Sequence, residues 1–253
     1  MSTTADLTGR RVLVTGASSG IGEQTCRTLV RCGALVAMLA RRKDRLEQLQ
    51  AELGDRTHAV PCDVTDIDAL RGAVDVSASA LGGLDAVVAV AGQSMVGSIA
   101  TGEPDVWGRL LTLNLLGPLA AAQLALRHFP AEGKRDIVVL GSTGGMNAMA
   151  GAGVYGASKA GLHAACEALR LELAPEGVRV GVVKPGYFET EILSTSVVFN
   201  GEAPRTPPPP LFIDGGQIGQ PGVVADAIAF MLDLPDGVAV NEIVLRPTGQ
   251  LFP

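Results

Sequence analysis

Cysteine, histidine, aromatic residues and positive charge are all scarce in this chain. Its 253 residues include 4 cysteines, 3 histidines and only 4% aromatic residues. The cysteines lie far apart, with no CxxC pair and no Cys/His cluster, so neither a zinc site, nor any other metal, nor a disulfide framework is expected. Lysine and arginine number 20 against 26 acidic residues, a net charge of −6, which argues against nucleic acid or anionic lipid as a partner.

Hydrophobic runs long and uniform enough to cross a membrane are also lacking. The most apolar stretch, residues 110–129, is broken by polar residues and by Gly117 and Pro118, so it is interpreted as a buried helix. The first residues contain no apolar segment of the kind found in signal peptides. We therefore expect a cytoplasmic protein with reduced thiols and no membrane partner.

What the chain does have is a hydrophobic content of 47%, which can form a sizeable core, and a regular alternation of strand and helix patterns. Seven runs rich in valine, leucine and alanine predict strands at residues 11–15, 34–40, 57–62, 84–90, 136–140, 178–183 and 242–246. The runs are apolar throughout, which is typical of parallel strands covered on both faces. The pattern predicts a single α/β domain, residues 1–253, of the Rossmann type: a doubly wound, parallel, seven-stranded sheet with helices on both faces.

One segment interrupts this alternation. Prolines and glycines crowd residues 201–222, between the sixth predicted strand and the last helix. A proline run is extended and semi-rigid and cannot form a central strand. We interpret the region of about residues 190–220 as a lid over the substrate, with a plain surface loop as the alternative.

The first predicted strand leads directly into the glycine-rich motif TGASSGIG and a helix. Glycines at such a junction let the backbone turn tightly and approach a pyrophosphate, and the helix N-terminus offers free N–H groups. A glycine turn without a ligand is the alternative. The motif residues predicted to bind a dinucleotide are Gly16, Ser18, Ser19, Gly20, Ile21 and Gly22.

The end of the second predicted strand points to the type of dinucleotide. NAD-selective sites usually carry a carboxylate there, bonded to the ribose 2′-hydroxyl, whereas this chain has Arg41 and Arg42. Paired guanidinium groups can bind a 2′-phosphate through charge-assisted hydrogen bonds, so the predicted cofactor is NADP(H). The alternative is that the cations only begin a solvent-exposed helix, the role expected of Lys43 and Arg45.

A second group of polar residues suggests proton transfer. Tyr155 and Lys159 are four residues apart on one predicted helix and therefore share a face. A cation about 4 Å from the phenol would bring its pKa from about 10 towards 7, so that Tyr155 could protonate an alkoxide. Ser142, at a strand end, can donate a hydrogen bond to the substrate oxygen that Tyr155 would protonate. Asn114, just before a Gly-Pro pair, can hold a water in a relay to Lys159. Taken singly, Ser142 could be a hydroxyl group in a turn, Asn114 a hydrogen-bonded amide in the core and Tyr155 a packed aromatic residue.

With the glycine motif, these four residues resemble the short-chain dehydrogenase/reductase family along essentially the whole chain. The resemblance implies that Tyr155 is the general acid and base and that Lys159 bonds the ribose and tunes the phenol. It implies that Ser142 orients the carbonyl and that Asn114 holds water. Members of the family are usually dimers or tetramers, so a homodimer or homotetramer is expected.

Further cofactor contacts are expected where strands end. They are Asp63, Val64, Ala91, Gly92, Pro185, Gly186 and Thr190. Asp63 is predicted to accept a hydrogen bond from the adenine amine or to cap the next helix, and the resemblance places the last three beside the nicotinamide. Where the family usually shows NNAG, residues 89–92 of this chain read AVAG. The missing amides usually brace the strand end, so its local stability and the packing of adenosine are in question. Gly92 still permits a close approach of the backbone to the cofactor.

The leading hypothesis is an NADPH-dependent ketoreductase that converts a small-molecule ketone into a secondary alcohol. The substrate pocket is predicted to be mostly apolar, which suits a bulky, uncharged ketone. A further resemblance, to ketoreductases that tailor aromatic polyketides, implies a polycyclic aromatic ketone of the angucyclinone type, formed in antibiotic biosynthesis. The predicted lining residues are Ser94, Met95, Gly144, Tyr187, Ile192 and Leu193.

Two alternatives remain. The tail VNEIVLRPTGQ suggests a dehydrogenase of small 3-hydroxy acids, although no lysine or arginine lies between Phe188 and Asn200, and only Arg205 could reach the pocket. A non-catalytic NADP(H)-sensing protein is the other, disfavoured because tyrosine and lysine are both present.

The three histidines share no spacing with each other, so we expect them at the surface or an interface and not in catalysis. They are His58, His128 and His163.

Overall fold

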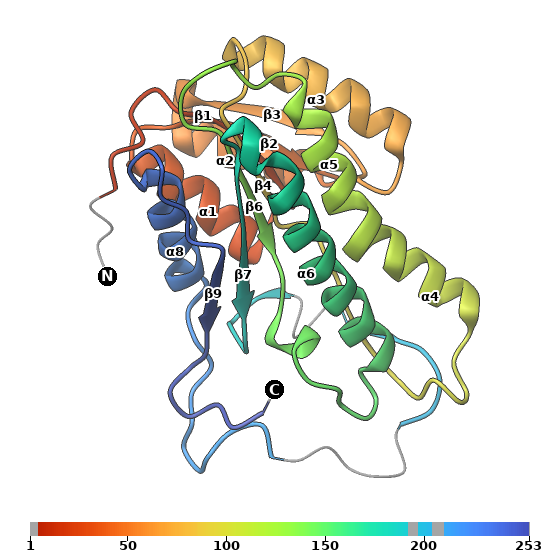
Figure 1. The fold of residues 1–253 in the computed structure, drawn as a ribbon. Helices are drawn as coiled ribbons and strands as arrows, with labels where there is room; N and C mark the ends of the chain where they lie inside the picture. The colour runs from red at the N-terminus through yellow and green to blue at the C-terminus, as the bar shows by residue number, and fades with distance from the viewer. Residues whose placement is uncertain (1–4, 192–196, 204–209, 253) are drawn as a thin grey trace.

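The computed structural model describes residues 5–191, 197–203 and 210–252, in which strands and helices alternate along the chain (Figure 1). The strands are β1 (Arg11–Thr15), β2 (Leu35–Ala40), β3 (Thr57–Pro61), β4 (Ala86–Ala89), β5 (Ser94–Val96), β6 (Asp136–Leu140), β7 (Arg179–Pro185), β8 (Val197–Phe199) and β9 (Glu242–Leu245). The helices are α1 (Gly20–Arg31), α2 (Lys43–Leu53), α3 (Ile67–Leu81), α4 (Pro104–Leu111), α5 (Gly117–Leu126), α6 (Gly153–Leu173) and α8 (Pro221–Asp233).

Seven of the strands form a parallel sheet in the order β3-β2-β1-β4-β6-β7-β9. The predicted sheet is confirmed, and each predicted strand boundary falls within two residues of the observed one. The chain leaves β1 towards β2 and β3 and later returns on the other side of β1 at β4. Such a switch point at the carboxyl ends of parallel strands is where α/β proteins bind ligands. The register pairs Thr15 with both Leu39 and Ala89, so three strand ends are level there.

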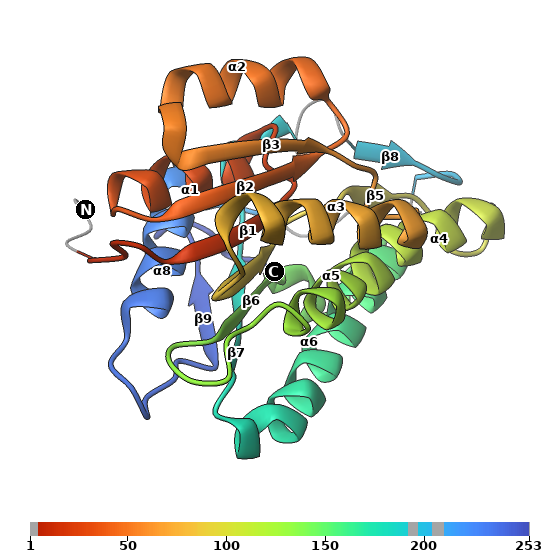
Figure 2. The same cartoon turned by 90° about the horizontal axis from the view of Figure 1, so that it is seen from above.

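Alternate residues of the strands enter two separate cores. In β1, Leu13 packs with residues of α3, α5 and α6, whereas Val12 and Val14 pack with residues of α1, α2 and α8. The view in Figure 2 shows these two groups of helices on opposite sides of the sheet. Both faces of the central strands are therefore buried, which explains why the strand sequences are apolar without alternation.

The edge of the sheet differs from the prediction. Within the part of the chain that the structure describes, strand β9 pairs with β7 alone. Its residues alternate between exposed and partly buried, so the expected covering of both faces is wrong for this strand. A second, two-stranded parallel sheet joins β5 to β8 and places Ser94 and Met95 near the carboxyl ends of the main sheet. Each of these strands has only three residues, too few for a recognisable pattern.

The apolar stretch near the middle of the chain is a continuous helical run, Pro104–Leu126. Its length and mean hydropathy of 1.3 would suit a membrane span, but 44% of the apolar window is buried inside the protein, where α5 packs against α3 and α6. This is a core helix, as interpreted from the sequence. Between α4 and α5 the run widens into a five-residue π-helix, Thr112–Leu116, just before Pro118, which has no N–H to donate to the preceding turn.

Candidate active site

The glycine-rich turn after β1 forms one end of the site. Gly16 and Gly20 have φ angles of +72° and +55°, which favour glycine. A β-carbon on Gly16 would lie 2.8 Å from the backbone nitrogen of Ala91, and one on Gly22 would collide with the carbonyl oxygen of Gly16. Helix α1 begins at Gly20, so its free N–H groups face the turn. This is a cradle that fits the pyrophosphate of a dinucleotide.

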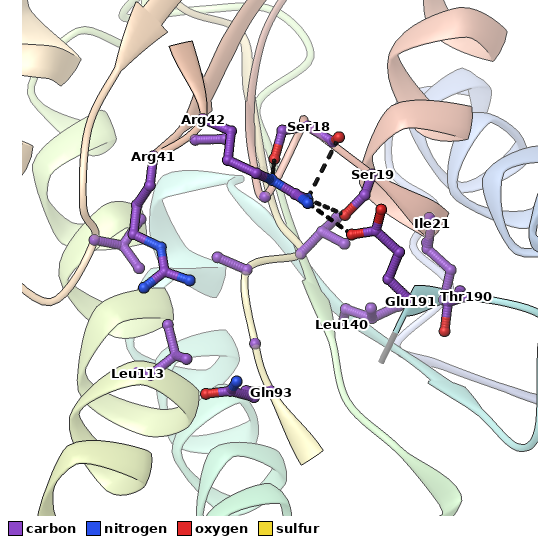
Figure 3. A pocket seen from close by; sticks show the side chains of 18 of the residues that line it. Ser18, Ser19, Ile21, Arg41, Arg42, Gln93, Leu113, Leu140, Thr190 and Glu191 are labelled. Atoms are coloured by element: carbon purple, nitrogen blue, oxygen red, sulfur yellow. Dashed lines mark hydrogen bonds and ion pairs between the residues drawn. The ribbon is translucent and has the colours of Figure 1, made fainter. Parts of the chain in front are cut away.

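A cavity of about 240 Å³ extends from this turn across the ends of β1 to β4 (Figure 3). The predicted cofactor residues that line it are Gly16, Ser18, Ser19, Gly20, Ile21, Gly22, Arg41, Arg42, Asp63, Val64, Ala91, Gly92 and Thr190. They come from segments far apart in the sequence and meet at the switch point of the sheet. The shape and donor groups of this cavity fit a nicotinamide dinucleotide.

The two arginines after β2 have different surroundings. The Arg41 side chain is 69% exposed and lies 3.9 Å from Asp63, the distance of a loose ion pair. Arg42 reaches across the cavity and donates hydrogen bonds to Ser18 Oγ (3.1 Å) and Ser19 Oγ (2.6 Å), as Figure 3 shows. It also forms an ion pair of 2.7 Å with Glu191, a residue that the sequence did not suggest.

Arg45 does not merely face solvent, as had been expected. Its guanidinium group also pairs with Glu191, so two arginines hold this one carboxylate. The hydrogen bonds that Arg45 and Arg42 donate, aided by their charges, lower the pKa of Glu191 to about 2. The carboxylate is therefore ionised at any pH near neutrality.

The start of α3 and the end of β4 are each held by hydrogen bonds to a side-chain oxygen. Helix α3 is capped by Asp66, which accepts a 3.0 Å hydrogen bond from the N–H of Ala69, so Asp63 is not the cap. In place of the missing amides of the AVAG segment, Thr15 Oγ1 accepts hydrogen bonds of 3.2 Å from the N–H groups of Val90 and Ala91. The end of β4 is thus braced by a hydroxyl group from the neighbouring strand.

A second cavity, of about 140 Å³, adjoins the first and shares Gly92, Leu140 and Thr190 with it. Of the described residues that line it, Lys159 alone carries a charge. The predicted residues found in its walls are Ile21, Gly92, Ser94, Met95, Ser142, Gly144, Tyr155, Lys159, Pro185, Gly186, Tyr187 and Thr190. Ile192 and Leu193, also predicted here, lie outside the described residues.

Tyr155 and Ser142 lie together on one wall of this second cavity. Ser142 follows β6, and its Oγ accepts a 3.0 Å hydrogen bond from the N–H of Gly144. Tyr155 lies in the first turn of α6. A β-carbon on Gly144 would be 3.2 Å from the Tyr155 ring and 3.4 Å from Ser142 Oγ, so the absence of a side chain at Gly144 lets both residues pack closely against this loop.

The acidity of Tyr155 differs from the prediction. Burial raises the pKa of the phenol above its usual value, and the hydrogen bond with Ser142 only partly offsets this. The Lys159 ammonium, expected to lower that pKa, instead donates a 2.9 Å hydrogen bond to the carbonyl oxygen of Leu140. The pKa of Lys159 is itself lowered by burial to about 8. The expected shift of the phenol towards 7 is therefore wrong for this structure, because desolvation dominates the pKa of Tyr155 and the Lys159 ammonium does not lower it.

Asn114 lies in the π-helical turn and is fully buried. Its Oδ1 accepts a 2.9 Å hydrogen bond from the N–H of Gln93, and its Nδ2 donates to the Gln93 carbonyl at 2.9 Å and to Ser158 Oγ at 3.2 Å. A β-carbon on Gly92 would be 3.2 Å from Asn114 Oδ1 and 3.5 Å from Lys159 Nζ. The π-helix thus brings Asn114 next to Lys159 and ties it to the loop after β4.

His163 contradicts the expectation that the histidines lie at the surface or an interface. It is partly buried, one turn beyond Lys159 on α6, and its Nε2 accepts a 3.3 Å hydrogen bond from the backbone N–H of Ser142. Burial, aided by Lys184 and Lys159, lowers its pKa to about 4, so the ring is neutral. The four-residue spacing from Lys159 was the one available signal in the sequence.

Comparison with known proteins identifies relatives of the whole domain. The family model described as short chain dehydrogenase matches residues 10–198. The chain is 38% identical to a glycine betaine reductase of Emericella nidulans over 247 residues, which are 96% of this chain but only 19% of that much longer protein.

Two solved structures are similar over nearly the full length. One is a short chain dehydrogenase from Burkholderia cenocepacia in complex with NADP, with a TM-score of 0.81, 31% identity, and coverage of 95% of this chain and 98% of that one. The other is a 3-ketoacyl-(acyl-carrier-protein) reductase from Brucella melitensis complexed with NADH, with a TM-score of 0.84, 26% identity, and coverage of 96% and 99%.

Proposed function

This chain belongs to the short chain dehydrogenase family and is an oxidoreductase, and we propose that it is an NADPH-dependent ketoreductase that converts an uncharged ketone into a secondary alcohol. The observation that carries the proposal is the pair of hydroxyl groups, Tyr155 and Ser142, on the wall of a cavity continuous with the nucleotide cavity. When bound, the cofactor supplies a hydride to the carbonyl carbon. The chain's own residues hold the ketone and supply the proton.

Tyr155 is the proposed general acid. Because burial raises the pKa of its phenol, the hydroxyl group stays protonated at neutral pH and is available to an oxygen that gains negative charge. Ser142 Oγ, which lines the same cavity, is proposed to hydrogen-bond that oxygen and orient it. Lys159, 4% exposed, is proposed to bond the cofactor ribose and to stand in the relay that restores the proton of Tyr155, and Asn114 is proposed to hold a water that connects this relay to Lys159.

The cofactor is NADP(H). Related structures contain NADP or NADH, and the present chain has arginines, not a carboxylate, directly after β2. Arg41 and Arg42 are the proposed ligands of the 2′-phosphate, because guanidinium groups form charge-assisted hydrogen bonds with phosphate oxygens. Asp63 is the proposed acceptor for the adenine amine.

The proposed substrate is an aromatic ketone, and the finer proposal is a polycyclic aromatic polyketide of the angucyclinone type. The cavity beside Tyr155 is lined by Met95, Tyr187 and Phe188 and has no acidic side chain among its described residues. Tyr187 packs edge-to-face on Phe212, with ring centroids 5.7 Å apart, which offers a flat aromatic wall. The volume of about 140 Å³ is below the range usual for drug-sized ligands, so ketones of several sizes need to be compared.

The other candidates make different demands on the cavity. A small 3-hydroxy acid would need a cation for its carboxylate, and Arg205, the residue suggested for this, lies outside the described residues. The name of the relative called glycine betaine reductase suggests a small substrate with a quaternary ammonium group as another candidate, but the present chain spans only a fifth of that protein. The role of residues 190–220 as a lid also stays a prediction.

A substrate panel tests the proposal. Purified protein and NADPH are mixed with one-ring and polycyclic aromatic ketones, small 3-keto acids and a quaternary-ammonium aldehyde, and loss of NADPH is followed by absorbance. The proposal predicts turnover with aromatic ketones. Turnover confined to the keto acids or the aldehyde would replace the proposed substrate, and NADPH binding without any turnover would favour a sensing protein.

A further inference from the structure

Glu191 lies at the border of the nucleotide cavity, directly after Thr190, and is held by cations from another part of the chain. Its Oε2 is 2.7 Å from Nη1 of Arg42, and its Oε1 is bonded by Nη1 of Arg45. The Glu191 side chain is 31% exposed. Figure 3 shows this carboxylate facing the guanidinium group of Arg42, next to Ser19.

The groups around this carboxylate are those that bind a phosphate monoester. Two guanidinium groups supply charge and directed N–H donors, and the hydroxyl groups of Ser18 and Ser19 lie within hydrogen-bond distance of Arg42. Arg42 stands at the end of β2, where the adenosine ribose of a dinucleotide is recognised. An internal anion therefore already neutralises Arg42, one of the two arginines proposed to bind the 2′-phosphate, together with the neighbouring Arg45.

We propose that Glu191 is a cofactor-selectivity residue, whose carboxylate competes with the 2′-phosphate of NADP(H) for Arg42 and Arg45. This inference rests on the proposed binding of NADP(H) in the cavity. Arg42 and Arg45 must give up some or all of their hydrogen bonds to Glu191 before they can bind a phosphate. NAD(H) has a ribose hydroxyl in place of the phosphate and makes no such demand.

The consequence is a weaker preference for NADP(H) than the arginines alone would give. The Glu191 pair opposes the binding of NADP(H) and leaves the binding of NAD(H) unaffected. Arg41, which is 69% exposed and only loosely paired with Asp63, stays available to the phosphate. Removing the charge of Glu191 should therefore strengthen binding of the phosphorylated cofactor alone.

Calorimetric binding of NADP+ and NAD+ to the full chain tests this inference, because the two ligands differ only by the 2′-phosphate. In Glu191→Gln the dissociation constant for NADP+ should fall about tenfold, while that for NAD+ stays unchanged. Glu189→Gln is the matched control: it removes a nearby acid whose observed partner is Gln220, at 2.8 Å, and it should change neither constant.

Several outcomes overturn the inference. One is an affinity of Glu191→Gln for NADP+ that is unchanged or weaker than that of the wild-type protein. Another is an equal change in affinity for NADP+ and NAD+, which would mean that Glu191 stabilises the chain around it and does not compete with the phosphate. If the glutamine variant does not fold, the carboxyl ¹³C signal of Glu191 in the wild-type protein gives the answer: it should shift on addition of NADP+ and not of NAD+, and an unmoved signal with NADP+ contradicts the competition. Failure of the wild-type protein to bind either cofactor would instead refute the proposed function.

Discussion

The backbone N–H of Ser142 donates a 3.3 Å hydrogen bond to Nε2 of His163. Because Nε2 is the acceptor, the proton of this neutral imidazole is on Nδ1. The bond connects the start of the loop after β6 to the middle of α6, the helix that also carries Tyr155 and Lys159. His163 thus fixes the position of Ser142 relative to Tyr155 without lining the cavity itself.

Loss of this acceptor should reduce turnover more than cofactor binding. In His163→Leu the N–H of Ser142 loses its partner, at a cost of about 1–3 kcal/mol. We expect kcat to fall about tenfold while the dissociation constant for NADPH stays the same. Steady-state kinetics and calorimetry measure the two quantities.

Two variants test whether the hydrogen bond is the cause. His163→Gln keeps a side-chain acceptor and should recover part of the lost kcat. His128→Gln alters a histidine that pairs with Asp75, away from the site, and should leave kcat unchanged. Equal losses in the leucine and glutamine variants would show that the ring packs and does not position Ser142.

His163 should also make the stability of the fold depend on pH. Burial is the main cause that lowers its pKa to about 4, and the charges of Lys184 and Lys159 act in the same direction, with Glu242 acting in the opposite one. An unfolded histidine has a pKa of about 6.5, so the unfolded chain takes up a proton first as the pH falls. The stability linked to His163 is therefore fully present above pH 6.5 and is lost as the pH falls from about 6.5 to about 4.

Urea unfolding at several pH values measures this effect. The free energy of unfolding of the wild-type protein should fall across that window more steeply than that of His163→Gln, which has no group to titrate there. Parallel curves for the two proteins would contradict the neutral, buried state of the ring.

Asn114 should contribute strongly to stability. Its side chain satisfies both the N–H and the carbonyl group of Gln93 and also bonds Ser158, in a fully buried position. Asn114→Ala leaves these groups without partners, so the free energy of unfolding should fall by about 2–4 kcal/mol. Chemical denaturation measures this, and a loss below about 1 kcal/mol would show that the bonds are readily replaced. Thr112→Ala, in the same π-helix but exposed, serves as the control.

The regular part of the fold could be predicted from the sequence because local patterns determine it. Apolar runs such as residues 136–140 identified the strands, and the glycine spacing identified the turn before α1. The spacing of Tyr155 and Lys159 placed both on one helix. Each of these signals lies within a few consecutive residues.

What the sequence could not provide depends on contacts between distant segments. Glu191 and Arg42 are 149 residues apart, and nothing in either neighbourhood marks them as partners. The pKa of Tyr155 was predicted in the wrong direction because spacing shows that a lysine shares its helix face but does not show how deeply the phenol is buried. The hydroxyl group that braces the AVAG segment comes from Thr15, on another strand.

The most direct test of the account is the substitution Tyr155→Phe, which removes only the phenolic oxygen. The account predicts that kcat for ketone reduction falls by a factor of about 10² to 10⁴, while the calorimetric dissociation constant for NADPH is unchanged. Full turnover by Tyr155→Phe, with NADPH bound as in the wild-type protein, would contradict the assignment of Tyr155 as the proton donor and with it the proposed reaction.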